Sequence, residues 1–460
     1  WRIYKQEFTQ MFRLSLPIVA AQVGIVLLGV TDNMMVGYLG ATELAAAGIA
    51  NSIFFVISIV GLGLTSVISP MSAAAKARQD HTQLRHLLLN VVRASVLCGL
   101  FTVGLVYLTA YFFEVFRQPA DVAVLAKPYL IVIGWSALPL IVFAGLRSFI
   151  EGLSIIRPGM YISYLAVVIN VFLNWVLIFG HWGFPAWGLW GAGVATLLSR
   201  IFIALLFWGF ILRSSRIKPY AQQWQIWKDD TTQLVQIFKL GIPAGMQYFF
   251  EVAAFSSAAV LAGWLGKVSL AAHQIAISLA SVTYMMAAGF GSAGAIRVGA
   301  AFGHRHRLKI LRAANTAYWG VVAFMSFTCV IFIVFGDQLV WLYIQDAEVI
   351  ALAAPLMIIA AFFQLSDGVQ VVGLGVLRGI ADLKVPTFFT LIAYWVVGLP
   401  LGYWLGFYTP LGVNGIWIGL SVGLTVSAAL LTNRFYKLLR LMKKETLRPR
   451  TEKPAATTVA

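Results

Sequence analysis

Twelve long apolar stretches, separated by short polar segments, run along the chain. Each is long enough for a helix of about 20 residues, the length that crosses the hydrocarbon core of a bilayer. The twelve predicted spans are residues 13–38, 44–74, 87–112, 122–147, 158–180, 187–212, 236–264, 269–298, 310–336, 347–377, 384–408 and 411–438. The pattern therefore predicts an all-α, polytopic membrane protein with twelve transmembrane helices.

Composition supports this class and excludes others. Apolar residues make up 60% of the 460 residues and charged residues only 11%, against about 45–50% and about 25% in ordinary soluble domains. Such a chain is too apolar for a water-facing globule or for a disordered protein. We find no metal-ligand cluster, nucleophile motif or phosphate-binding loop, so we expect neither an enzyme nor a cofactor.

The net charge of +16 has an explanation within a membrane protein. Of the 33 Lys and Arg residues, 28 lie in the termini and in alternate loops, whereas Arg117, Lys127 and Lys267 lie in the loops between. Basic loops mark the cytoplasmic side. We therefore predict cytoplasmic termini, and the positive charge gives no reason to expect a nucleic-acid partner.

The two halves of the chain resemble each other. Leu14-Ser15-Leu16-Pro17 matches Leu240-Gly241-Ile242-Pro243, and Gly188 and Trp190 later match Gly415 and Trp417 in nearly the same register. Six spans per half leave equivalent spans in the same orientation, as in transporters built from parallel repeats. We predict an N-terminal lobe (1–212), a cytoplasmic linker (213–235), a C-terminal lobe (236–440) and a disordered tail (441–460), with the lobes related by a pseudo-two-fold axis. An ion channel remains an alternative.

Three acidic residues lie well inside predicted spans, namely Asp32, Glu251 and Asp367. Each costs about 2.5 kcal/mol or more to insert, so a buried carboxylate is a candidate functional group. The structural alternatives are a carboxyl kept neutral by burial and one paired with hydrogen-bond donors. No span clearly carries a Lys or Arg at comparable depth, which argues against salt bridges.

Amide side chains accompany these carboxylates at helical spacing. Gln364, Asp367 and Gln370 share one face of a span, as do Gln247 and Glu251, and Asn170 and Asn174 share a face of another. Oxygen-rich faces suit a hard cation, and carboxylates suit a proton. Either ion could drive antiport against an organic cation. Interhelical hydrogen bonding is the alternative for the amides.

Several motifs together resemble a known family, the multidrug and toxic compound extrusion (MATE) transporters of the NorM branch. The stretches that carry the resemblance are Val30-Thr31-Asp32-Asn33-Met34-Met35-Val36-Gly37, Tyr248-Phe249-Phe250-Glu251-Val252, Gln364-Leu365-Ser366-Asp367-Gly368-Val369-Gln370, Leu377-Arg378-Gly379 and Asn170-Val171-Phe172-Leu173-Asn174-Trp175. Matches extend over nearly the whole chain.

The resemblance implies two lobes around a cavity, and export of organic cations, amphipathic drugs and antimicrobials in exchange for Na+ or H+. It places a C-lobe cation site on Glu251 and Asp367, and an N-lobe site on Asp32, Asn170, Asn174 and Thr196, so a bound Na+ is expected at Glu251, Asp367 or Asp32. Phe363 departs from relatives that have Tyr four residues before the aspartate. The resemblance also implies a monomer in the bacterial inner membrane. A lipid-linked oligosaccharide flippase of the same superfamily is the rival function.

Overall fold

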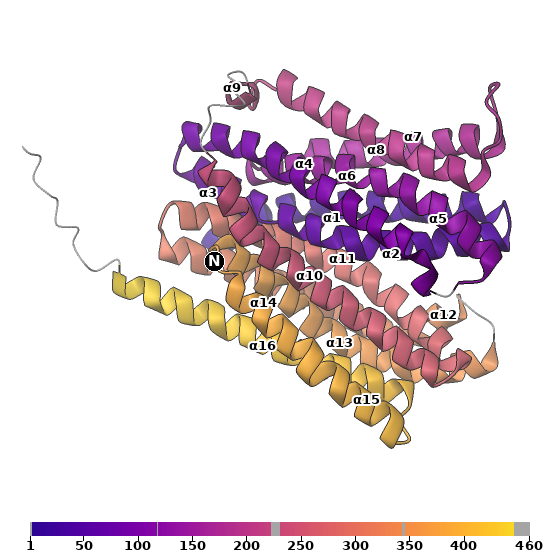
Figure 1. Cartoon of the computed structure of the whole chain (residues 1–460). Helices are drawn as coiled ribbons and strands as arrows, with labels where there is room; N and C mark the ends of the chain where they lie inside the picture. The colour runs from indigo at the N-terminus through magenta and orange to yellow at the C-terminus, as the bar shows by residue number, and fades with distance from the viewer. Residues whose placement is uncertain (1, 117, 222–230, 343–345, 446–460) are drawn as a thin grey trace, which may run out of the picture.

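The computed structural model describes residues 2–116, 118–221, 231–342 and 346–445, and it contains helices and no strand within those ranges (Figure 1). The elements, in chain order, are α1 (Arg2–Gly37), α2 (Ala41–Thr65), α3 (Ile68–Ala77), α4 (His81–Tyr111), η1 (Phe113–Phe116), α5 (Ala120–Trp135), α6 (Ala137–Gly152), α7 (Arg157–Phe179), α8 (Gly188–Arg213), α9 (Lys218–Ala221), α10 (Thr232–Trp264), α11 (Lys267–Gly303), α12 (Arg307–Trp341), α13 (Ala347–Gly379), α14 (Lys384–Leu391), η2 (Ile392–Gly398), α15 (Leu399–Tyr408) and α16 (Val413–Glu445).

These helices confirm the predicted all-α membrane fold. Eleven segments in the described parts of the chain are long and apolar enough to cross a membrane. The predicted span 236–264 corresponds to α10, which is not among these eleven. α10 has 33 residues, but Gln247 and Glu251 lower its mean hydropathy. α16 continues through Glu445, beyond the predicted start of the tail.

Three predicted spans consist of more than one helical element. The predicted span 44–74 is α2 followed by α3, 122–147 is α5 followed by α6, and 384–408 is α14, η2 and α15. η2 is a π-helical segment, in which the backbone hydrogen bonds reach one residue further than in an α-helix. Pro400 follows this segment and lacks a backbone N–H, so the local bonding pattern has to change near it.

The helices form two bundles, α1–α8 from the first half and α10–α16 from the second (Figure 1). α9 lies between them in the chain, and residues 222–230, which are part of the predicted linker, lie outside the described residues. We call the end of the molecule where α1 begins and α16 ends the basic end, because the Lys- and Arg-rich loops connect the helices there.

The two halves pack together near the basic end. α10 packs against α2, and α11 packs against α1 and α3. A Cβ atom added at Gly63 would lie 2.6 Å from the Cα of Gly245, so only a glycine allows this approach of the two backbones. Arg297 of α11 also bonds to Glu7 and Gln10 of α1, which adds an ion pair to the seam.

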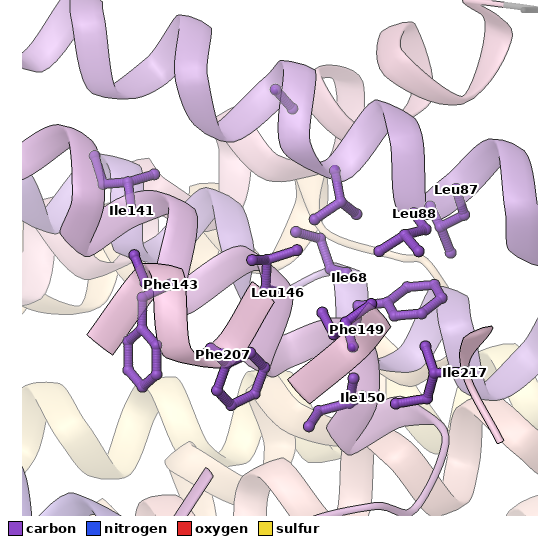
Figure 2. Close-up of a cluster of buried hydrophobic side chains, with 14 of the residues drawn as sticks. Ile68, Leu87, Leu88, Ile141, Phe143, Leu146, Phe149, Ile150, Phe207 and Ile217 are labelled. Atoms are coloured by element: carbon purple, nitrogen blue, oxygen red, sulfur yellow. The ribbon is translucent and has the colours of Figure 1, made fainter. Parts of the chain in front are cut away.

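A large apolar cluster fills the first half near its basic end (Figure 2). Ile68, Leu88, Phe149 and Phe207 contribute fully buried side chains to it from α3, α4, α6 and α8. Burial of these side chains removes apolar surface from water and lipid, and it packs α6 against its neighbours.

Candidate functional site

The first half holds a hydrogen-bonded cluster around Asp32 of α1. The Asn174 amide of α7 donates to Asp32 Oδ1 at 2.5 Å, and the Thr196 hydroxyl of α8 donates to Asp32 Oδ2 at 3.2 Å. Asn174 also donates to Asn170 Oδ1 at 3.1 Å, one turn earlier on α7. The structure thus brings together all four residues that the sequence placed in the N-lobe site.

Arg200 completes this cluster, which we call the first-half site (Asp32, Asn170, Asn174, Thr196, Arg200). It follows Thr196 by one turn of α8, and its charge acts on Asp32. Its guanidinium donates to the Ser136 hydroxyl at 2.5 Å and lies 5.1 Å from the centre of the Phe54 ring, within the range of a cation–π contact. Asp32 therefore has both donors and a positive charge nearby.

The second half brings Glu251 of α10 and Asp367 of α13 together. Their exposed fractions are 6% and 3%, and their charges act on each other. Neither carboxylate has a hydrogen-bond donor among the described residues. Gln247 is buried one turn before Glu251. Two carboxylates without donors in a buried site repel each other when both are ionised.

The two glutamines that flank Asp367 reach to neighbouring helices. Gln364 accepts a hydrogen bond from Thr328 of α12 at 2.8 Å, and its own buried amide nitrogen has no partner within the described chain. Gln370 donates to the Tyr394 hydroxyl of η2 at 2.9 Å. The predicted shared face of Gln364, Asp367 and Gln370 therefore holds α13 against two other helices, with Asp367 between the two contacts.

Arg378 brings a positive charge to the second half. It lies near the end of α13 with its guanidinium 5.5 Å from the centre of the Tyr248 ring, and its charge acts on Glu251. Its buried Nε has no hydrogen-bond partner among residues that the structure describes. We call Glu251, Asp367, Gln247, Gln364, Gln370, Tyr394 and Arg378 the second-half site.

These arginines correct one expectation from the sequence, that no Lys or Arg lies at the depth of the carboxylates. Arg200 lies near Asp32 and Arg378 near Glu251. The expectation was wrong because helices of different lengths and tilts bring together residues at different distances from their span ends. Arg147, which was counted with the loops, is buried in α6.

Phe363 lies to one side of the acidic pair. Its ring packs against Phe255 at 5.9 Å and Trp417 at 5.3 Å, and only 3% of it is exposed. Phe255 in turn packs against Tyr394 at 5.8 Å. Tyr394 was not predicted from the sequence, because nothing in its spacing marks it, although the charges of Glu251 and Asp367 act on its phenol.

The second-half site offers ligands that a cation or a proton can bind. The carboxylates and amides of the second half are oxygen ligands of the kind that hard cations prefer, and the carboxylates can instead take up protons. No group of three or more His, Cys, Asp or Glu side chains in the described ranges is arranged to hold a metal ion. The second-half site therefore offers carboxylate and amide oxygens to a hard cation, or carboxylates to a proton.

A family model described as MatE matches the chain twice, over residues 17–176 and 243–404. The two matches begin at Pro17 and Pro243, the pair from which the internal repeat was predicted. One match thus falls in each bundle of helices.

Full-length relatives match the chain closely. It is 35% identical over 439 residues to a "Probable multidrug resistance protein NorM" of Rhizobium meliloti (strain 1021), covering 94% of both chains. It is 34% identical over 447 residues to the "Multidrug resistance protein NorM" of Aliivibrio fischeri, covering 95% of this chain and 96% of that one. The fold matches the crystal structure of the eukaryotic MATE transporter AtDTX14 with a TM-score of 0.85 at 21% identity, over 96% of this chain and all of that one.

Proposed function

The chain belongs to the MATE family of transporters, and on that premise we propose that it exports organic cations and antimicrobials in exchange for Na+ or H+. The ion is its only expected cofactor. The observation that carries the proposal is the buried pair Glu251 and Asp367, which has no hydrogen-bond donor in the part of the chain that the structure describes and has Arg378 nearby. Two carboxylates and one guanidinium leave one negative charge, which a Na+ ion or a proton neutralises.

The packing of the two halves supports alternating access. The contacts of α10 with α2 and of α11 with α1 and α3 lie near the basic end, which we place in the cytoplasm by the excess of positive charge there. We propose that lobes 1–212 and 236–440 rock about this seam, as in other parallel-repeat transporters. We also propose a monomer in the bacterial inner membrane, as the relatives' bacterial origin suggests.

Coupling follows from competition for charge. An ion that enters from the outside neutralises Glu251 and Asp367 and weakens their attraction for a bound organic cation, which then leaves. After reorientation, a new organic cation displaces the ion into the cytoplasm. A ligand shifts such an equilibrium only by its differential affinity for the two states, so the ion has to bind the inward-facing state more tightly than the outward-open state if it is to favour reorientation.

The test is transport in proteoliposomes that contain the full chain and a fluorescent organic cation, ethidium. A Na+ gradient is imposed at fixed pH, and in a parallel experiment a pH gradient is imposed without Na+. We expect one of the two ion gradients to drive ethidium across the membrane in the direction opposite to the ion flow. Glu251→Gln and Asp367→Asn should each retain less than about a tenth of this transport.

Glu114→Gln provides the matched control, because Glu114 is an exposed carboxylate in η1 and should leave transport unchanged. Gradient-driven transport that survives in both Glu251→Gln and Asp367→Asn would contradict the proposal. Ethidium flux that does not saturate and needs no ion gradient would instead indicate a channel.

A further inference from the structure

A groove with a volume of about 610 Å³ lies between α13 and α16. α16 is the outer helix of the second half and lies at the edge of the molecule farthest from the first half (Figure 1). The groove is lined by Leu365, Ser366 and Val369 of α13, not by Asp367, whose charge acts on Glu251 of α10. It is therefore separate from the two sites described above, and it lies on the outer helix of the second half.

The part of the groove farther from the basic end is lined mainly by apolar side chains. Leu365 and Val369 form one side, and Ala428 and Ala429 form the other. Ala429 is exposed, and its side chain is a single methyl group. A longer side chain at this position would fill the groove. Small residues of this kind allow a chain of methylene groups to lie against a helix.

The end of the groove nearest the basic end is polar. Asn433, Tyr436 and Arg440 line it from one face of α16 at spacings of three and four residues. The Tyr436 hydroxyl donates to Asn315 of α12 at 2.8 Å, which closes the back of the groove. The Arg307 guanidinium donates to the Leu439 carbonyl at 2.8 Å, which brings a second positive charge to this end.

Two polar side chains in this region lack a partner. Asn433 and Arg440 are both exposed, and neither makes a side-chain hydrogen bond or ion pair within the described residues. A carboxamide that faces hydrocarbon without a partner is costly. Asn433 lies seven residues from Arg440, so it is about 10 Å deeper in the membrane at a rise of 1.5 Å per residue.

We propose that this groove binds an anionic phospholipid of the cytoplasmic leaflet. Arg440 binds the phosphate, Asn433 donates to an ester carbonyl of the glycerol backbone, and one acyl chain lies along Ala429, Val369 and Leu365. The lining residues of α16 extend over about 22 Å, from Thr425 to Arg440, which is enough for a headgroup and one chain in a single leaflet. Basic pockets between helices on the cytoplasmic side bind such headgroups.

The test measures lipid retention by the purified full chain. The protein is exposed to an equimolar mixture of phosphatidylglycerol and phosphatidylcholine with identical acyl chains, and the bound lipid is counted by native mass spectrometry. We expect phosphatidylglycerol to be retained over phosphatidylcholine by about fivefold, the effect of one basic residue near a membrane surface. Arg440→Gln should remove this preference.

Lys437→Gln is the matched control, because Lys437 is an exposed basic residue on the same helix that does not line the groove. It should keep the preference for phosphatidylglycerol. Ala429→Phe fills the groove and should lower retention of both lipids by about the same factor, and unchanged thermal unfolding would verify that each variant folds. Equal loss in Lys437→Gln and Arg440→Gln, or full retention in Ala429→Phe, would overturn the proposal.

Discussion

In the first half of the molecule, the carboxylate of Asp32 accepts hydrogen bonds from Asn174 and Thr196 and lies near Arg200. In the second half, Glu251 and Asp367 are buried, have no hydrogen-bond donor among the described residues, and are close enough for their charges to interact. The two halves therefore share a plan of helices but not of charges. A carboxylate with donors is stabilised by the protein itself, whereas the described residues give the acidic pair no such donor.

The same contrast separates two arginines that occupy similar places in the repeat. Leu146-Arg147 near the end of α6 resembles Leu377-Arg378 near the end of α13, and each arginine has an acidic residue four positions later. Arg147 bonds to Glu151 at 2.6 Å. Asp382, by contrast, bonds to Arg434 at 2.9 Å and not to Arg378. The Arg378 guanidinium lies above the ring of Tyr248. Of Arg147 and Arg378, only Arg147 has an ion pair among the described residues.

The largest effect is expected from breaking the pair in the first half. Arg147 and Glu151 each have side chains only 10% exposed, and Arg147→Gln leaves a buried carboxylate without its partner. Removing one member of a buried pair costs about 3–5 kcal/mol, so thermal unfolding should shift strongly to lower temperature. Arg434→Gln breaks a pair with 27% and 19% exposure and should cost about 1 kcal/mol or less. Equal shifts in the two variants would remove the contrast.

The next effect concerns ion affinity. Asp367→Asn removes one of two mutually repelling carboxylates, and we expect binding of the coupling ion to weaken at least about thirtyfold, which corresponds to about 2 kcal/mol. Asp32→Asn removes a carboxylate that already has donors and a nearby arginine, and it should change ion affinity less than about threefold. Isothermal titration of the purified protein with Na+, and with acid, measures both. A larger loss in Asp32→Asn would place the ion in the first half.

Much of this arrangement could be predicted from the sequence. The twelve apolar stretches predicted the helices, because a helix depends on residues close together in the chain. The matching motifs at Pro17 and Pro243 predicted the repeat. The joining of Asp32 with Asn170, Asn174 and Thr196 was expected from the family resemblance, and the structure has these contacts.

The rest depends on how the helices are rotated against each other. Tyr394 contacts Gln370 from the π-helical segment η2, and no sequence period indicates such a segment. Arg200 and Arg378 reach carboxylates on other helices, a relation set by tilt and packing. The Arg147–Glu151 pair, in contrast, was readable from its i, i+4 spacing and was missed because both residues lie near a predicted loop.

A smaller effect is expected within the first-half site. Asn174→Leu removes the 2.5 Å hydrogen bond to Asp32, and hydrogen bonds to charged groups contribute about 1.5–3 kcal/mol. Thr196→Val removes a longer bond of 3.2 Å and should cost less. A double-mutant cycle with Asp32→Asn isolates each contribution in thermal unfolding. Coupling energies near zero for both pairs would show that the donors do not stabilise Asp32.

The smallest effect is expected at the position where this chain departs from some of its relatives. Phe363→Tyr adds a hydroxyl to a ring that packs between Phe255 and Trp417, whereas Tyr394 already places a phenol in the field of Glu251 and Asp367. We expect Phe363→Tyr to change ion affinity less than about twofold, and Tyr394→Phe to weaken it more, because it also leaves Gln370 without its 2.9 Å partner. The same titration compares the two variants. A gain of tenfold or more in Phe363→Tyr would show that the new hydroxyl reaches the ion, and that the second half uses position 363 rather than Tyr394 to complete its site.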